Sequence, residues 1–252
     1  MSRSDLPPLD AHAHIAGDVT QLQLDSLGDA VVIAMTGSLA EARFALRANG
    51  ATSPRVVWSA GTHPGDVGAL SRFRVAELAA LIDLVAVVGE VGLDRRGERS
   101  DQGRVFDEIL EVTSARPVIL SVHSTGRRSD VLDALEMRPP AAAVLHWFTG
   151  TSAEIERAAE MGCYFSVNAA MSAEVLLKLP VERVLTETDF PASRRSTLAS
   201  RPGDTHAAEV QLQRLWSADA RQQVWCNFAA LTRQAGVARK LPPSVQALLN
   251  GG

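Results

Sequence analysis

The feature of this sequence that most constrains its fold is a regular alternation of short apolar runs with longer amphipathic segments. The runs are rich in Val, Ile, Leu and Ala, and they cover residues 9–15, 30–35, 56–62, 84–93, 117–123, 142–147, 163–167 and 183–188. Strands that are apolar throughout are typical of a parallel sheet whose two faces are both buried. The segments between the runs carry apolar residues at helical spacing, as at Phe106, Ile109 and Leu110. This alternation predicts an α/β fold, a TIM (β/α)8 barrel, with an open doubly wound sheet as the alternative.

The organisation along the chain favours a single domain. Its 252 residues suit one barrel, which at this length buries most of the surface that the unfolded chain exposes. The sequence contains no fixed-period repeat, low-complexity segment or linker that would separate two domains. We expect a barrel over residues 9–240 and a flexible tail over residues 1–8. We also expect a loose tail over residues 241–252, which hold a double proline and two terminal glycines.

Composition narrows the class of protein further. With 46% hydrophobic and 21% charged residues, the chain is neither a disordered polyelectrolyte nor a coiled coil. No apolar run approaches the roughly 18 residues of a membrane span, and no apolar stretch follows the first arginine as in a secretory signal. We therefore expect a cytoplasmic protein. The net charge of −4 argues against a broad basic surface for nucleic acid, which leaves local arginine pairs such as Arg127 and Arg128 as candidates for phosphate contact.

Residues that are able to bind metal collect at one end of the predicted strands. Five of the six histidines lie at or just past the carboxyl end of a strand. With two carboxylates, the set is His12 and His14 in the first strand, His63 after the third, Glu90 in the fourth, His123 in the fifth, His146 in the sixth and Asp189 after the eighth. In a barrel these strand ends converge on one face, where the βα loops build the active site.

The chemistry of this set points to divalent cations. His12 and His14 stand two positions apart in an extended segment, so both rings project to the same side and are able to bind one ion. With Glu90, His123, His146 and Asp189, the set offers four imidazoles and two carboxylates. Such donors suit one or two ions such as Zn²⁺, Mn²⁺ or Mg²⁺. The alternative for each histidine is a hydrogen-bonded polar group at a strand end.

Six short motifs give the sequence a specific resemblance. They are DAHAHI (10–15), GTHP (61–64), VGEVGLD (88–94), VHS (122–124), LHWFTG (145–150) and ETDFP (187–191). In this order and at these intervals they resemble the signatures of TatD-type metal-dependent deoxyribonucleases, in the amidohydrolase-like superfamily. The resemblance extends over residues 9–228 if Asn227 matches the late asparagine of that family. The fold of the family is a TIM barrel, which agrees with the strand pattern.

The resemblance implies a phosphodiesterase site with two divalent metal ions. His12, His14 and Asp189 would hold one ion, His123 and His146 the other, and Glu90 would bridge the two. Asp189 and Glu90 would be the catalytic carboxylates, because Asp189 would orient the attacking water or accept its proton. His63 would contact the substrate phosphate, with a structural hydrogen bond as the alternative. We also place Arg127 and Arg128 among the substrate-binding residues. Asp10 and Asp94 would either support a ligand histidine or cap a loop.

Two positions depart from the pattern of the family. Gly65 stands where the family commonly has a second histidine after the GxHP proline, and Thr125 stands where it commonly has an arginine. All six proposed metal ligands are kept, so the departures concern the substrate surface rather than the metal site. They favour a specialised substrate or partner. Some shortened, divergent members of the family occur in bacterial anti-phage defence gene clusters, and this chain resembles them.

Three functions follow as hypotheses. The leading one is a metal-dependent nuclease that removes nucleotides from DNA, at single strands or frayed ends, because a barrel mouth does not reach the interior of a duplex. The second hypothesis has the same metal site hydrolyse an ester or amide bond instead of a phosphodiester, as in a D-aminoacyl-tRNA deacylase. Glu90 argues against the lysine-bridged metal amidohydrolases, since no lysine lies near it. The third is a subunit that recruits nucleic acid or protein partners to a defence complex.

Overall fold

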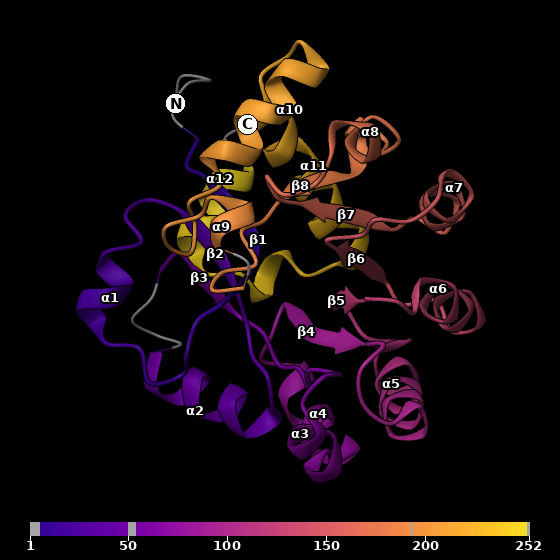
Figure 1. Ribbon diagram of the computed structural model, residues 1–252. Helices are drawn as coiled ribbons and strands as arrows, with labels where there is room; N and C mark the ends of the chain where they lie inside the picture. The colour runs from indigo at the N-terminus through magenta and orange to yellow at the C-terminus, as the bar shows by residue number, and fades with distance from the viewer. Residues whose placement is uncertain (1–5, 50–53, 193, 251–252) are drawn as a thin grey trace.

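Parallel strands form the inner layer of the molecule, and helices surround them (Figure 1). The computed structural model describes residues 6–49, 54–192 and 194–250. Within these ranges the strands are β1 (Leu9–His14), β2 (Val31–Met35), β3 (Val56–Trp58), β4 (Val87–Gly92), β5 (Ile119–His123), β6 (Ala142–His146), β7 (Tyr164–Val167) and β8 (Val184–Thr186). They pair in chain order, β1 to β3 and β4 to β8. Each of the eight apolar runs contains one of these strands.

Hydrogen bonds join the two groups of strands into a closed barrel. Between β3 and β4, the Ala60 amide donates to the Val87 carbonyl and the Gly89 amide donates to the Ala60 carbonyl, both at 3.2 Å. A Cβ atom on Gly61 would lie 2.2 Å from the Gly89 carbonyl carbon, so only glycine permits this approach. Between β8 and β1, the Asp189 amide donates to the His12 carbonyl at 2.9 Å. The predicted single-domain TIM barrel is confirmed.

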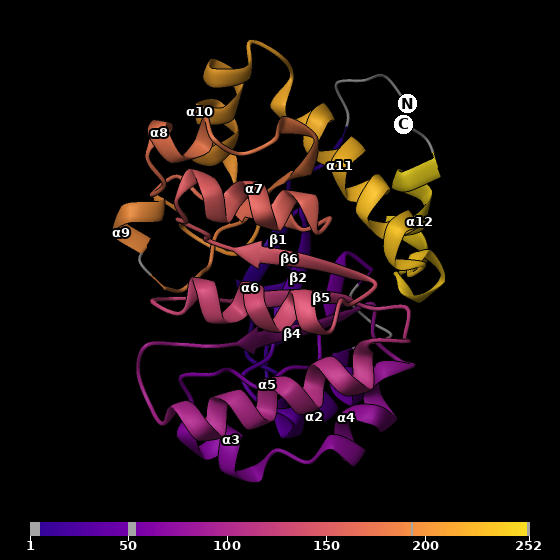
Figure 2. The ribbon, with the colours of Figure 1, turned by 90° about the vertical axis from the view of Figure 1, so that its right-hand side faces the viewer.

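Helices cover the outside of the barrel and one of its ends. They are α1 (Gln21–Asp25), α2 (Leu39–Asn49), α3 (Val67–Arg72), α4 (Val75–Ile82), α5 (Arg99–Thr113), α6 (Arg128–Met137), α7 (Ser152–Glu160), α8 (Ala173–Leu176), α9 (Arg194–Thr197), α10 (His206–Trp216), α11 (Ala220–Ala235) and α12 (Pro243–Asn250). Two 3₁₀ turns lie at Val181–Arg183 and Ala238–Lys240. Figure 2 shows α11 and α12 at the end of the barrel opposite α9. In the described ranges, no helix is long and apolar enough to cross a membrane.

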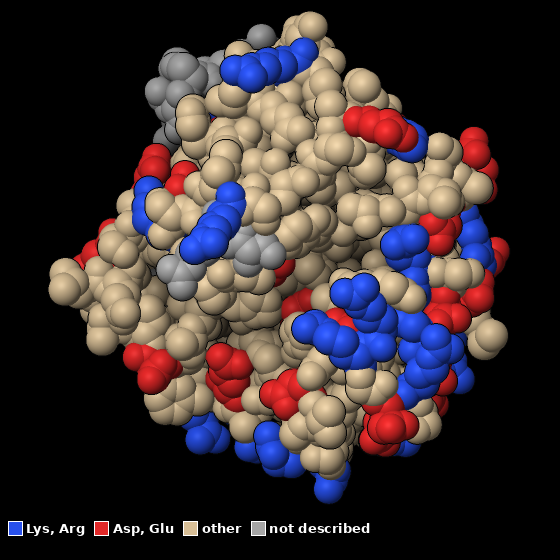
Figure 3. Space-filling model, viewed as in Figure 1, with Lys and Arg blue, Asp and Glu red and all other residues tan. Residues whose placement is uncertain are grey.

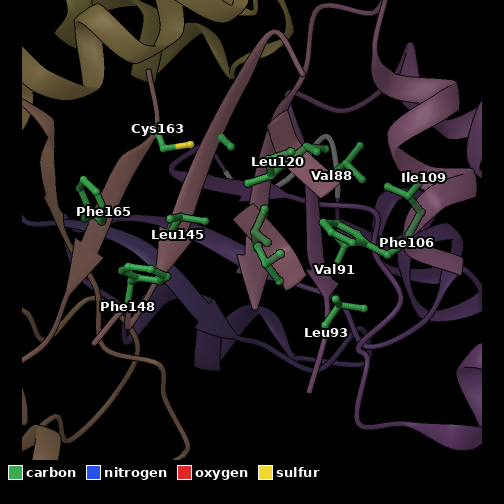
Figure 4. Close-up of a cluster of buried hydrophobic side chains, with 14 of the residues drawn as sticks. Val88, Val91, Leu93, Phe106, Ile109, Leu120, Leu145, Phe148, Cys163 and Phe165 are labelled. Atoms are coloured by element: carbon green, nitrogen blue, oxygen red, sulfur yellow. The ribbon is translucent and has the colours of Figure 1, made fainter. Parts of the chain in front are cut away.

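The core has two layers, because successive strand residues point to opposite faces. Outward-facing residues such as Leu120 and Leu145 pack against the helices, where Phe106 and Ile109 of α5 belong to the same buried cluster (Figure 4). Inward-facing residues such as Ile119 pack inside the barrel, and Phe228 of α11 belongs to that second cluster. The amino-terminal half of the barrel interior is therefore apolar and covered by α11.

Polarity changes along the inward-facing positions of the later strands. From the amino to the carboxyl end these positions are Ile119, Ser121 and His123 in β5, Val144 and His146 in β6, Tyr164 and Ser166 in β7, and Leu185 in β8 with Glu187 directly after it. The first residue of each series is buried among apolar side chains. The last residue belongs to a polar cluster at the mouth. Because alternate residues of a strand share a face, the apolar core residues and the polar residues of the mouth both point into the barrel.

The last segment of the chain differs from the sequence-based expectation. Residues 241–250 were expected to form a loose tail, but α12 begins at Pro243, and Leu241, Val245 and Leu248 are buried in the inner cluster. Proline suits the first turn of a helix, where its missing amide hydrogen has no intrahelical partner to lose. Residues 251 and 252 lie outside the described residues. At the other end, the Trp225 indole donates to the Pro7 carbonyl at 2.8 Å, which attaches this part of the expected 1–8 tail, while residues 1–5 lie outside the described residues.

Candidate metal centre

The carboxyl ends of the strands surround a hollow on the face that Figure 3 presents, with acidic side chains visible inside it. All six residues predicted to bind metal lie there. They are His12, His14, Glu90, His123, His146 and Asp189, and every one except the half-buried His14 is buried. The structure therefore brings together side chains that lie as far apart in the sequence as His12 and Asp189.

The first group of donor atoms comes from β1 and from the turn after β8. We call His12 Nε2, His14 Nε2 and Asp189 Oδ1 the β1/β8 set. Asp189 Oδ1 lies 3.8 Å from His12 Nε2 and 3.6 Å from His14 Nε2. Asp189 itself has a positive φ of 49°, a conformation that aspartate tolerates better than most residues and that turns the chain sharply after β8. These atoms are close without being in hydrogen-bond contact.

The second group comes from β5 and β6. We call His123 Nδ1 and His146 Nε2 the β5/β6 set, and the two atoms lie 3.0 Å apart. Glu90 Oε1 lies 2.5 Å from His123 Nδ1 and 2.9 Å from His146 Nε2. These three atoms therefore form a compact cluster.

Glu90 stands between the two sets and gives one oxygen to each. Its Oε1 faces the β5/β6 set, whereas its Oε2 lies 3.7 Å from His12 Nε2 and 3.3 Å from His14 Nε2. Glu90 is placed by β4, whose pairing with β5 shifts register between Val88 and Val91. A carboxylate oriented in this way is able to bridge two cations.

Hydrogen bonds orient two of the histidine rings. His123 Nε2 lies 2.9 Å from Asp94 Oδ2, so with an ion bound the ring proton would stay on Nε2 and the lone pair of Nδ1 would face the ion. Asp94 in turn accepts hydrogen bonds from the Arg96 side chain. His12 Nδ1 lies 2.9 Å from Ser121 Oγ, which leaves Nε2 for the β1/β8 set. Asp94 thus contacts the ring of a histidine that is predicted to bind metal, in agreement with one of its two predicted roles.

Asp10 ties the first strand to the last. Its carboxylate accepts hydrogen bonds from the Thr188 hydroxyl at 2.6 Å, the Thr188 amide at 2.9 Å and the Gly203 amide at 2.7 Å. A fourth bond comes from the His12 amide at 3.3 Å. Burial raises the pKa of Asp10 to about 7, against the lowering effect of these donors. Asp10 touches no ring nitrogen of a ligand histidine in these contacts, so it holds the backbone that carries His12 and Asp189.

His63 borders the centre but is oriented differently. Its Nε2 lies 3.4 Å from Glu90 Oε2, and its Nδ1 accepts a hydrogen bond from the Gly65 amide at 2.9 Å. The proton of the neutral ring is therefore on Nε2, which makes this atom a donor rather than a metal ligand. Burial is the main reason that the pKa of His63 is lowered, so the neutral form is favoured. This geometry supports the predicted contact with a substrate oxygen.

Glu187 is a buried member of the site that sequence reasoning missed. It accepts hydrogen bonds from the Ser166 hydroxyl and, at 2.9 Å, from the Asn168 amide group, and its Oε2 lies 3.7 Å from His146 Nδ1. The signal that identifies it is its position two residues before Asp189, on the same face of the chain. Glu187 thus lies behind His146, on the side away from Glu90.

The charges of the buried groups are balanced among themselves. Burial opposes ionisation of Glu90, yet the neighbouring imidazoles, His146 foremost, hold the pKa of Glu90 well below its usual value. Burial likewise lowers the pKa of His146, but Glu90 and Glu187 raise it well above its usual value. An ionised carboxylate in this position requires positive charge close by. In the protein without metal, a protonated imidazole supplies that charge.

The donor set fits divalent cations. His12 Nε2 and Glu90 Oε2 are both buried and have no hydrogen-bond partner among the described residues. Leaving such a group unsatisfied costs about 1–3 kcal/mol, which a cation between them would recover. Two atoms that bind one Zn²⁺ at about 2.1 Å each lie roughly 3–3.5 Å apart, close to the separations within both sets. Imidazole and carboxylate donors in this mixture suit Zn²⁺ and Mn²⁺.

The two predicted substrate-binding arginines lie at the start of α6, on the rim of the hollow. The side chain of Arg127 is only 9% exposed, and its Nε bonds to Asp130. The Nε of Arg128 lies 3.5 Å from Glu154 Oε2 at the start of α7. Neither arginine contacts a metal-ligand candidate in these pairs, so their place is beside the centre rather than within it.

A (β/α)8 barrel with histidine and carboxylate donors at the carboxyl ends of its strands defines a metal-dependent hydrolase. Residues 9–231 match the family model described as TatD related DNase. The chain belongs to this family, whose named relatives are nucleases.

Two curated relatives illustrate the match. The 3′-5′ ssDNA/RNA exonuclease TatD of Escherichia fergusonii is 30% identical over 162 residues, which cover 58% of this chain and 62% of that exonuclease. The 3′-5′ ssDNA/RNA exonuclease TatD of Musicola paradisiaca is 32% identical over 209 residues, which cover 70% of this chain and 77% of that exonuclease.

Solved structures agree on the fold. The TatD homologue YJJV of Escherichia coli K12 superposes with a TM-score of 0.76 at 22% identity, over 88% of this chain and 96% of that chain. A TatD family hydrolase of Entamoeba histolytica gives a TM-score of 0.72 at 16% identity, over 89% and 97% of the two chains. At these identities the likeness concerns the barrel itself.

Proposed function

We propose that this protein is an exonuclease that hydrolyses phosphodiester bonds of DNA at single strands or frayed ends, with two divalent ions in its active site. The observation that carries the proposal is the orientation of Glu90, whose Oε1 faces the β5/β6 set and whose Oε2 faces the β1/β8 set. His12, His14 and Asp189 would hold one ion and His123 and His146 the other. When bound, the ions polarise phosphoryl oxygens and lower the pKa of water.

The remaining roles fall to side chains that touch the substrate or the water. Asp189 would accept the proton of the attacking water or orient that water. In the protein without metal, burial raises the pKa of its carboxyl to about 6. The water oxygen would form a bond to phosphorus while the phosphorus–oxygen bond to the leaving nucleotide breaks, and the leaving oxygen would take a proton from solvent water. His63 donates its Nε2 proton in a hydrogen bond to a phosphate oxygen, since its Nδ1 is already an acceptor of the Gly65 amide.

Support for a DNA substrate comes from the family and from the shape of the site. The matching family model is a DNase, and the two curated relatives carry names that specify single-stranded DNA and RNA. The ligand candidates are buried at the mouth of a barrel, where they reach a flexible strand end more easily than the interior of a duplex. A single-stranded end therefore fits the geometry best.

The test is degradation of end-labelled single-stranded and duplex DNA by the purified protein. Chelated protein is supplied with Mg²⁺, Mn²⁺ or Zn²⁺, beside the variant Asp189→Asn. We expect metal-dependent cleavage of the single strand, lost in the variant, with a product ladder that gives the polarity. Metal bound by the protein without cleavage of either DNA would contradict the proposal, and hydrolysis of an aminoacyl ester instead would assign the site to the alternative reaction.

A further inference from the structure

Four arginines stand on one side of the hollow, in the loops that follow β4 and β5 and at the first residue of α6. We call Arg95, Arg96, Arg127 and Arg128 the arginine rim. Figure 3 shows basic side chains gathered on the α5 and α6 side of the hollow, with acidic side chains along the α2 and α3 side. In the sequence, the loops after β1, β2 and β3 (residues 15–20, 36–38 and 59–66) contain Asp18 and Asp66 and no lysine or arginine. The loops after β4 and β5 therefore bring positive charge to the mouth, and those after β1 to β3 do not.

The backbone fixes where Arg95 lies. Its amide donates to the Thr125 carbonyl at 2.8 Å, which joins the loop after β4 to the loop after β5. Gly126 has a φ of 69°, and a Cβ on it would lie 2.8 Å from the Cβ of Arg95. The Arg95 side chain thus lies across Gly126, beside Arg127. Arg95 is exposed, so its guanidinium is open to solvent.

Arg96 brings positive charge next to the catalytic groups. It donates to Asp94 through Nε at 3.0 Å and through Nη2 at 2.8 Å, and Asp94 contacts His123. Its side chain is nevertheless 70% exposed. A Cβ on Gly65 would lie 3.6 Å from Arg96 Nη2 and 2.9 Å from the His63 ring. The guanidinium therefore lies beside His63, at a position that a larger residue at 65 would crowd.

The remaining two arginines carry donors that the protein does not use. The side chain of Arg127 is only 9% exposed. Its Nη1 has no hydrogen-bond partner among the described residues. Arg128 approaches Glu154 only at 3.5 Å and keeps 35% of its side chain exposed. A guanidinium has five N–H donors and binds phosphate oxygens in pairs. Unused, oriented donors beside a phosphodiesterase centre match a row of phosphates.

We propose that the arginine rim holds the backbone phosphates of single-stranded DNA on the β4 and β5 side of the centre, so that the strand leaves the site over these loops and not over those of β1 to β3. This inference rests on the proposed function. Phosphate contacts of this kind supply affinity without sequence preference, and they weaken as salt rises. The rim would therefore govern how the enzyme distinguishes a strand from a single phosphodiester.

The test compares two double variants that each remove two arginines. The rim variant is Arg95→Gln with Arg128→Gln, because neither residue hydrogen-bonds a ligand candidate. The control is Arg104→Gln with Arg138→Gln, two exposed arginines on α5 and at the end of α6. The substrates are a 12-nucleotide single strand and bis(4-nitrophenyl) phosphate. We expect the ratio of KM for the strand to KM for the small ester to rise about tenfold in the rim variant and to stay at the wild-type value in the control. An unchanged ratio in the rim variant, or an equal rise in the control, would overturn the inference.

A binding measurement separates this inference from the proposed function. Fluorescence anisotropy of the labelled strand is recorded with Asp189→Asn protein, with and without the two rim substitutions, over a range of salt concentrations. Each lost phosphate contact lowers the slope of log Kd against log salt by about 0.7, so we expect a decrease of about 1.4. If the slope is the same in both proteins, the proposed role of the arginine rim is wrong. If the slope decreases as expected but the wild-type protein does not cleave the strand, only the proposed nuclease activity is wrong.

Discussion

The two donor sets of the metal centre are built in different ways. The β5/β6 set comes from neighbouring strands, its two members are 23 positions apart in the sequence, and its atoms lie within 3.0 Å of each other. The β1/β8 set joins the first strand to the turn after the last. The same two strands are joined by a hydrogen bond from the Thr186 hydroxyl to the Leu9 carbonyl, across 177 positions of sequence. Its atoms lie 3.6–3.8 Å apart. One half of the site therefore depends on local strand pairing, and the other depends on closure of the whole barrel.

The supporting carboxylates differ in the same way. Asp94 acts on a ring, through its contact with His123 Nε2 at 2.9 Å. Asp10 acts on the backbone, by binding both the turn that carries Asp189 and the amide of Gly203. We therefore expect substitutions of Asp94 to disturb the orientation of the His123 ring. We expect substitutions of Asp10 to weaken the closure of the barrel between β1 and β8. The following variants test this difference, from the largest effect to the smallest.

Glu90→Gln should impair metal binding by both donor sets at once, so that the two sets no longer differ. The amide offers only one oxygen, so one of the two sets loses its shared donor and the buried negative charge is gone. We expect metal content to fall toward zero and the rate of strand cleavage to drop by roughly 10³-fold or more, which corresponds to about 4 kcal/mol. Metal analysis of the purified protein and a single-turnover assay measure both quantities. The exposed Glu98→Gln is the control, and a Glu90 variant that keeps two ions per chain would disprove the bridge.

Asp10→Asn should weaken the β1/β8 set and the fold together. All four partners of the carboxylate donate, so either orientation of the amide group places an N–H against another donor. The buried mismatch should cost about 1–3 kcal/mol of unfolding free energy. We expect a lower midpoint in thermal unfolding and the loss of one metal ion, with the other retained. If unfolding is unaffected, closure does not depend on this carboxylate.

Asp94→Asn should act on the β5/β6 set alone. Burial would raise the pKa of Asp94, but its hydrogen bonds from Arg96 and the charge of His123 lower it, so the residue is an anion that keeps the His123 proton on Nε2. Removal of such a partner typically costs 10–100-fold in metal affinity or activity. Metal titration of the chelated protein should show one weakened site and one normal site. Equal weakening of both sites would contradict the separation of the two sets.

Glu187→Gln should have the smallest effect of the four. The amide keeps an oxygen for Ser166 or Asn168 but loses the charge that faces His146 Nδ1 at 3.7 Å. Because no direct hydrogen bond to His146 is broken, we expect a decrease in kcat of less than about tenfold. Steady-state kinetics over a range of metal concentrations measure it. A loss as large as that of Asp94→Asn would show that Glu187 orients His146 as firmly as Asp94 orients His123.

Much of the fold was accessible from sequence because a barrel of parallel strands is apolar throughout. Each of the eight predicted runs contains a strand, and the six ligand candidates converge as expected. The carboxyl-terminal helix departs from the expectation because a double proline is compatible with a loose chain and also with the first turn of a helix. Leu241, Val245 and Leu248 nevertheless have the spacing of one helical face, and this apolar pattern decides the outcome.

The hydrogen-bond partners of the ligand candidates were harder to predict than the convergence of the candidates at one end of the barrel. Ser121 and Glu187 belong to common residue types, and their roles depend on which side chain the neighbouring strand places opposite them. Strand register in the barrel is a three-dimensional property that spacing along the chain does not give. The alternation along each strand does give one part of it, since Ser121 precedes His123 by two residues and Glu187 precedes Asp189 by two.

The inward-facing series in β5 to β8, apolar at one end and ligating at the other, has a consequence for how the length of this chain is able to vary. A single residue inserted between Ile119 and His123 would turn the imidazole toward the helix layer while Ile119 kept its place, because every later side chain would change faces. The same holds between Leu185 and Asp189. Insertions and deletions within the strands are thus far more damaging than substitutions, and related active enzymes should differ in length only in the loops that begin after the ligands.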